Sequence, residues 1–295
     1  MSFEFFSLMK HNQTLGFTLI ELLVVVAVLG ILAGGILIAL NIGGTLGKAN
    51  ITKAKRFAAS LENGLVISQV GNWSFEDGSA DTAKDTSGYG NNGNLAGATL
   101  CPGGTACPTW KTATDCDLGF GGCLSFDGTD DYVEILNSLP TNFGAGDFTL
   151  SAWINTTTTG SSKSIIETGV FGLMKSLRIN HTSSGELAFF VLGDAGGNQL
   201  EVNVNINDGS WHHVVGVRNG SNIKLYKDSV LVDSDNWDAG DTDTGAVWLV
   251  AKNFFGSSYT SGLIDEVQIY KEALTLSQIQ KLYAQGVISR ALAYR

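Results

Sequence analysis

Two spacings of apolar residues divide the chain near residue 70. Over 22–40, about 19 successive residues carry no charge and no strongly polar group, enough for a helix that crosses a bilayer. After a glycine-rich joint, apolar residues recur at helical spacing over 57–70. The two segments predict a long membrane and amphipathic helix over 17–70, either loosened at the glycines or broken there into two helices.

From about residue 73 the period of the pattern changes to two. Val202, Val204 and Ile206 alternate with asparagines, as expected for a strand with one wet face. Further segments of strand character, with turn residues between them, are 147–155, 186–194, 211–219, 223–233, 246–253 and 262–270. This many short strands predicts a two-sheet sandwich or jelly roll.

The last part of the chain returns to helical spacing. Thr275 and Gln278 have the spacing of a capping box, and apolar residues follow at helical positions. Gly286 predicts the end of this helix. The expected fold class is therefore α+β: a long N-terminal membrane and amphipathic helix, an all-β antiparallel jelly-roll sandwich and a short C-terminal helix.

Composition and charge narrow the function. The chain has 37 Gly but only 3 Pro, which is typical of a turn-rich β-domain, and its formal net charge is −10. Its basic cluster, Lys48, Lys53, Lys55 and Arg56, is interpreted as the solvated flank of the predicted helix. Because phosphate contacts need Lys and Arg gathered on one surface, no nucleic-acid partner is expected.

The four cysteines fall within one glycine- and threonine-rich segment: Cys101, Cys107, Cys116 and Cys123. Their spacings lack the C-x2-C knuckles of a zinc site. Two disulfides formed in an oxidising compartment are the favoured interpretation. Three pairings remain open, because the spacing does not choose among them.

The stretch GFTLIELLVVVAVLG, at 16–30, places the carboxylate of Glu21 beside the apolar run, where an unpaired charge is unfavourable. It resembles the leader-peptidase site and membrane helix of type IV prepilins and pseudopilins. The resemblance implies a single-pass precursor in the bacterial inner membrane, cleavage between Gly16 and Phe17 by prepilin peptidase, and N-methylation of Phe17. It also implies that Glu21 pairs with the Phe17 amine of a neighbouring subunit during filament assembly.

Two alternatives for this segment stay open. Lys and Arg are more numerous after the apolar run than before it, which by the positive-inside rule favours a cytoplasmic C-terminal part. A secreted protein cut near Ala33 is the other alternative. Since the leader motif and the cysteines both indicate export, we expect the C-terminal part at the cell surface or in an extracellular filament.

Five motifs follow one another from Trp73 onward: WSFEDGSADTAKDTSGYGNNGNLAG, GGCLSFDGTDDYVEI, FTLSAWINT, GSWHHVVGVRNGSNIKLYKDSVLV and GLIDEVQIYKEALTLSQIQKLY. In this order they resemble laminin-G-like domains of the concanavalin A-like lectin/glucanase superfamily. The resemblance implies a two-sheet antiparallel jelly roll, a carbohydrate or protein ligand and commonly a structural calcium ion. At Asp228-Ser229 the family favours Asp-Gly, so a longer hairpin turn is expected.

Calcium requires six to eight oxygen ligands. At the positions that the resemblance assigns to such a site, the chain has Glu76, Asp85 and Asp265. Acidic residues also cap glycine-rich turns, and that use of these carboxylates is the alternative.

Catalysis is not expected. A glycosidase needs two carboxylates about 5–10 Å apart, and the adjacent Asp265 and Glu266 would point to opposite faces of a regular strand. His212 and His213 diverge in the same way, and His213 is expected to be a packed strand residue. Three tryptophans could stack on sugar rings if they are exposed: Trp110, Trp153 and Trp237.

The predicted segments are a leader peptide over 1–16, a pilin-like helix over 17–70, a laminin-G-like domain over 71–286 and a tail over 287–295. The expected function is that of a type IV pilin-like filament subunit that displays a binding or adhesion domain. Its partners would be other subunits, prepilin peptidase, the inner membrane and an extracellular carbohydrate or protein. The alternatives are a pseudopilin of a type II secretion or DNA-uptake apparatus and a membrane-tethered lectin or glycan hydrolase.

Overall fold

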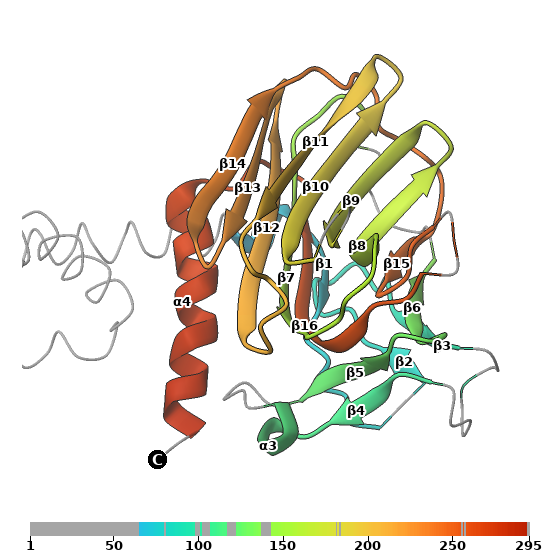
Figure 1. The fold of residues 1–295 in the computed structure, drawn as a ribbon, viewed down its shortest axis with the longest axis vertical. Coiled ribbons are helices and arrows are strands. Elements are labelled where there is room, and N and C mark those ends of the chain that lie inside the picture. Colours follow the sequence, from blue (N-terminus) through green and yellow to red (C-terminus); the bar gives the residue numbers. More distant parts are fainter. Residues whose placement is uncertain are drawn as a thin grey trace, which may run out of the picture. The chain divides into compact units, whose positions relative to one another are not determined.

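A computed structural model describes residues 65–293, apart from 80, 98–100, 102–106, 117–121, 137–142, 181, 183, 255 and 257. The predicted leader and membrane segment, with Gly16, Phe17 and Glu21, therefore lies outside the described residues. The chain divides into two compact units, and the second, Leu61–Arg295, contains a sandwich of two sheets (Figure 1). No helix in the described part is long and apolar enough to cross a membrane.

The first sheet has the spatial strand order β14-β13-β12-β7-β16-β5-β4, with β1 also paired to β16. Every pairing in it is antiparallel. The strands are β1 (Gln69–Trp73), β4 (Thr109–Lys111), β5 (Cys123–Asp127), β7 (Phe148–Asn155), β12 (Trp211–Asn219), β13 (Asn222–Lys227), β14 (Val230–Asn236) and β16 (Ser261–Tyr270).

The second sheet has the order β11-β10-β9-β8-β15-β6-β3-β2 and is likewise antiparallel. Its strands are β2 (Thr82–Ala83), β3 (Gly93–Ala96), β6 (Tyr132–Ile135), β8 (Lys163–Val170), β9 (Leu173–Ile179), β10 (Glu186–Gly193), β11 (Gly196–Asn203) and β15 (Trp248–Val250). The predicted antiparallel β-sandwich is confirmed.

Alternation along the strands builds the core between the sheets. Phe148, Leu150 and Ile154 of β7 and Phe189 of β10 are fully buried in one apolar cluster. Phe148 and Phe189 meet edge to face across the two sheets, with ring centroids 6.1 Å apart. This period of two is the pattern that predicted the strands.

The outer face of the first sheet is covered by helix α4 (Leu276–Ala293), as Figure 1 shows. Trp153 of β7 stacks on Tyr283 of α4, with ring centroids 5.6 Å apart. The capping box is confirmed, because the Gln278 N–H donates to Thr275 Oγ1 and the Thr275 N–H to Gln278 Oε1. The predicted end of the helix at Gly286 is wrong.

Gly286 lies inside α4 because of this packing. A Cβ atom at Gly286 would come within 2.2 Å of the Trp153 indole. The glycine therefore permits close approach of the helix to the sheet instead of terminating the helix. In the sequence, a glycine that ends a helix and a glycine that allows close packing look the same.

Two further local predictions are wrong. Residues 65–68 are helical but β1 begins at Gln69, so Val70, expected on the helix, is buried in a strand that pairs with β16. Asp228 and Ser229 both have positive φ, 51° and 64°, in a two-residue turn between β13 and β14. The Asp228 carboxylate accepts the His213 N–H at 3.0 Å, which helps the turn to stay short without glycine.

Candidate functional site

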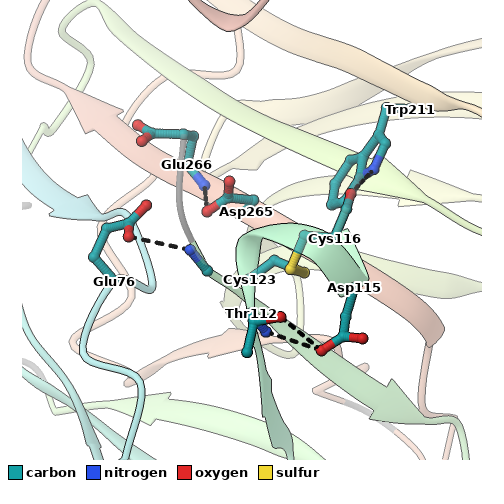
Figure 2. The surroundings of a disulfide bond; sticks show 9 residues. Glu76, Thr112, Asp115, Cys116, Cys123, Trp211, Asp265 and Glu266 are labelled. Atoms are coloured by element: carbon teal, nitrogen blue, oxygen red, sulfur yellow. Dashed lines mark hydrogen bonds between the residues drawn. A yellow bond between two sulfur atoms is a disulfide. The ribbon is translucent and has the colours of Figure 1, made fainter. Parts of the chain in front are cut away.

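The four cysteines form two local disulfides, Cys101–Cys107 and Cys116–Cys123. The second joins the short helix α3 (Ala113–Cys116) to the start of β5, and both of its cysteines are fully buried. The Trp211 indole N–H donates to the Cys116 carbonyl at 2.7 Å, which ties β12 to this segment (Figure 2). The prediction of two disulfides is confirmed. Of the three pairings left open by the spacing, the structure has the one that joins the first cysteine to the second and the third to the fourth.

Three carboxylates lie beside the second disulfide, those of Glu76, Asp265 and Glu266 (Figure 2). Glu76 Oε2 accepts the Gly122 N–H at 3.1 Å, and Asp265 Oδ1 accepts the Glu266 N–H at 2.8 Å. Burial raises the pKa of both Glu76 and Glu266, and the charge of Glu76 raises the pKa of Glu266 further. The charge of Glu76 therefore destabilises the ionised form of Glu266.

The strand that carries Asp265 and Glu266 is irregular at these two residues. The pairing of β16 with β7 shifts between Asp265 and Gln268, and Glu266 has a φ of 48°. Such a bulge breaks the two-residue period. It brings Glu266 under the electrostatic influence of Glu76, a relation that the strand pattern could not predict.

This group has the donor chemistry of a calcium site, since a cation would stabilise the ionised forms of Glu76 and Glu266, whose pKa values are raised. Asp85, the third predicted ligand, is engaged in a turn. Its Oδ1 accepts the N–H groups of Asn72 and Ser87 at 3.0 and 2.9 Å, and its Oδ2 accepts the Asn91 N–H at 2.8 Å. Asp85 thus caps a turn, the alternative considered from the sequence.

A second acidic group, Asp127, Asp130 and Asp131, lies in the connection from β5 to β6. One carboxylate oxygen from each lies within 4.8 Å of the others, the only such three-residue grouping in the part of the chain that is described. Asp131 Oδ2 accepts the Asp127 N–H at 2.9 Å, while the buried Asp131 Oδ1 has no hydrogen-bond partner. Burial, and the neighbouring Asp127 and Asp130, raise the Asp131 pKa to about 6. None of these three aspartates was predicted as a metal ligand from the sequence.

The adjacent histidines have separate surroundings, as expected. His212 Nδ1 lies 2.8 Å from Asp228 Oδ2, and its Nε2 lies 3.2 Å from Asp208 Oδ1. His213 Nε2 lies 2.9 Å from Ser151 Oγ, and its ring packs on Trp153 with centroids 5.1 Å apart. The prediction that His213 is a packed strand residue is confirmed.

The three candidate sugar-stacking tryptophans differ in exposure. Trp153 is buried under α4, and Trp110 is partly buried and meets Phe75 edge to face at 6.4 Å. Trp237, in the loop after β14, is 45% exposed. Of the three, Trp237 is the one placed to meet a ligand.

These features define a lectin-type β-sandwich with acidic loops. Residues 127–280, just over half of the chain, match the family model described as the concanavalin A-like lectin/glucanases superfamily, and the chain belongs to that superfamily. Residues 12–37 match the prokaryotic N-terminal methylation motif. The suspected fusion is therefore confirmed. The comparison with curated proteins found no match.

Solved structures share the fold of the sandwich. The binding domain of Paraclostridial Mosquitocidal Protein 1 has a TM-score of 0.58 at 17% identity over 74% of this chain and 52% of that one. Domain 4 of AbnA, an arabinanase from Geobacillus stearothermophilus solved with arabinotriose, has a TM-score of 0.57 at 18% identity. The match covers 73% of this chain and 98% of that one. The binding domain of botulinum neurotoxin DC, in complex with rat synaptotagmin II, has a TM-score of 0.53 at 17% identity. The match covers 75% of this chain and 52% of that one. The chain thus spans about half the length of the toxin binding domains it matches.

Proposed function

We propose that this chain is a type IV pilin-like filament subunit whose sandwich is displayed outside the cell as a binding or adhesion head. One observation carries the proposal: a prokaryotic N-terminal methylation motif and a concanavalin A-like sandwich occur in the same chain. Prepilin peptidase would cut between Gly16 and Phe17, and the segment after Phe17 would anchor the precursor in the inner membrane. Two local disulfides agree with folding of the head in an oxidising compartment.

Glu21 is the assembly residue in this proposal. Its carboxylate would be costly in the apolar run of a lone subunit and would be compensated by the Phe17 amine of a neighbour in the filament. Glu21→Ala should therefore leave the head folded and the leader cleaved, but remove the protein from sheared surface filaments. Glu62→Ala, which removes a carboxylate outside the apolar run, is the matched control. Normal filament content in Glu21→Ala cells would contradict the pairing.

The head is proposed to bind a carbohydrate or a protein and not to catalyse a reaction. The AbnA domain was solved with an arabinose oligosaccharide and the botulinum domain with a protein, so both ligand classes occur on this fold. Turnover of a glycan by the purified chain, abolished by one carboxylate substitution, would contradict a binding role. A pseudopilin is the second candidate, and surface filaments built of this chain would exclude it.

Calcium is proposed as a structural ion held by Glu76 and Asp265, with Glu266 contributing. The raised pKa values of Glu76 and Glu266 support a cation there. The Asp127, Asp130 and Asp131 group is the rival location. Thermal unfolding in calcium and in EGTA separates the two: a calcium-induced rise in the midpoint should be lost in Glu76→Gln and kept in Asp131→Asn. The reverse pattern would move the ion to the rival group, and no rise in the wild type would remove it.

A further inference from the structure

The loop after β14 presents a supported aromatic surface. The Trp237 N–H donates to the Ser221 carbonyl at 2.5 Å, which fixes the backbone where the indole begins. The indole lies next to Gly196, at the start of β11: a Cβ atom built at Gly196 would be 3.7 Å from Trp237 Cζ2. Gly196 has a φ of 112°, which favours glycine, so the position beneath the ring carries no side chain. The indole thus has a backbone support on one side and is 45% exposed.

The chain that follows Trp237 is fixed to the rest of the sandwich. The N–H groups of Asp194 and Ala195 donate to the Asp241 and Ala239 carbonyls at 2.9 and 3.1 Å. The buried Arg218 donates from Nη2 to the Gly240 carbonyl at 2.8 Å. A binding group held in this way loses little conformational freedom when a ligand arrives.

Polar side chains lie near Trp237 and Gly196 along β14 and β11. Asn198 Nδ2 donates to Asp235 Oδ2, so these side chains join β11 to β14 across the open side of the sandwich. Next to them, Ser221 Oγ donates to Asn236 Oδ1 at 2.7 Å. Asp235 and Asn236 are both exposed. The two residues before Trp237, and Asn198 two positions after Gly196, therefore supply carboxylate and amide groups.

We propose that Trp237, Asn198, Asp235 and Asn236 form a subsite for an uncharged glycan, which identifies the ligand class of the head and so rests on the proposed binding function. A sugar ring presents a C–H face that stacks on an indole and hydroxyl groups that bond to carboxylate and amide groups. Asp235, Asp238 and Asp241 make the loop acidic, which disfavours anionic sugars. A protein partner would need a broader apolar patch around the indole.

The test measures binding by the full processed chain, purified in detergent, by affinity electrophoresis in gels that contain one polysaccharide each. The neutral probes are arabinan, galactan, xylan and mannan, and alginate is the anionic probe. Retardation by at least one neutral polysaccharide is expected, with a dissociation constant raised at least tenfold in Trp237→Ala and much less in Trp237→Phe. Tyr89→Ala, which removes another exposed aromatic ring from a different loop, should bind as the wild type does.

A second variant keeps the proposal falsifiable if Trp237→Ala fails to fold. Asp235→Ala removes an exposed acceptor and should weaken the same interaction several-fold. Retardation by alginate alone, by none of the neutral probes, or equally in wild type and folded Trp237→Ala would overturn the glycan subsite. Cleavage at Gly16 and entry into filaments do not depend on Trp237, so failure here leaves the filament proposal to its own test.

Discussion

The carboxylates beside the Cys116–Cys123 disulfide and those around Trp237 belong to the same acidic chain but have opposite surroundings. Asp265 is fully buried and Glu266 is partly buried, the charge of the exposed Glu76 raises the Glu266 pKa, and all three carboxylates lie next to a fully buried disulfide. Asp235 and Asp238 are exposed and border an indole. The difference suggests that the first group serves the stability of the head and the second serves exchange with a ligand.

The largest expected effect on stability comes from removing the buried disulfide. Cys116→Ala with Cys123→Ala should lower the free energy of unfolding by about 2.5 kcal/mol, because a short closed loop no longer restrains the unfolded chain. Denaturant unfolding in detergent measures the change. Cys101→Ala with Cys107→Ala is the control and should cost less, since Cys101 and Cys107 are not fully buried. Equal or reversed losses would contradict the structural role of the buried pair.

Calcium should have the next largest effect, if it binds beside Glu76. A ligand present at about 40 times its dissociation constant stabilises a folded chain by roughly 2.2 kcal/mol. That gain should disappear in Glu76→Gln and persist in Trp237→Ala, since the two regions are proposed to act independently. Differential scanning calorimetry with calcium or EGTA measures both variants. Loss of the stability gain in Trp237→Ala would contradict the independence of the two regions.

Asp131 predicts a pH dependence of stability in EGTA. Its pKa is about 6 in the folded chain against an ordinary 3.8, so the folded state binds this proton more tightly than the unfolded state. Its contribution is therefore present at low pH and lost as pH rises from about 4 to about 6. The full pKa difference corresponds to about 3 kcal/mol, which solvent screening in this loop reduces to about 2 kcal/mol. Asp131→Asn should gain stability relative to the wild type through that window. Denaturant unfolding at a series of pH values measures the stability of both proteins. If the wild type and Asp131→Asn changed equally with pH, the Asp131 pKa would not be raised and the prediction would be wrong.

The smallest expected effect on stability is that of Trp237→Ala. Because nearly half of the indole is exposed, the free energy of unfolding should change by only about 1 kcal/mol while glycan binding is lost. Unfolding and affinity electrophoresis of the same preparation give both quantities. A large loss of stability would show that Trp237 serves mainly to stabilise the fold, which would contradict its assignment to ligand binding.

The sequence predicts the repeated features of the fold better than its irregular ones. The period of two locates strands such as β7, β10 and β12 within a residue or so, and the Thr275–Gln278 pair locates the start of α4. The end of α4 is not predicted correctly because Gly286 makes room for the Trp153 ring, and Trp153 lies far away in sequence. The relation of Glu266 to Glu76 is missed because a bulge leaves no periodic signal.

The candidate sites divide in the same way. The resemblance predicted Asp85 as a calcium ligand, and the structure shows its oxygens bonded within a local turn. Trp237 could be named as a sugar-stacking candidate from its residue type alone. Its exposure, and the glycine support beneath it, depend on contacts between β11 and the loop after β14 that no local pattern encodes.

The most direct test of the central claim is mass spectrometry of the N-terminal peptide of the protein recovered from sheared cell-surface material. A filament subunit with an external head predicts a peptide that begins at Phe17 and carries an added methyl group. A chain that begins at Met1 and occurs only in the membrane, or a soluble chain that begins near Gly34, would contradict the filament proposal.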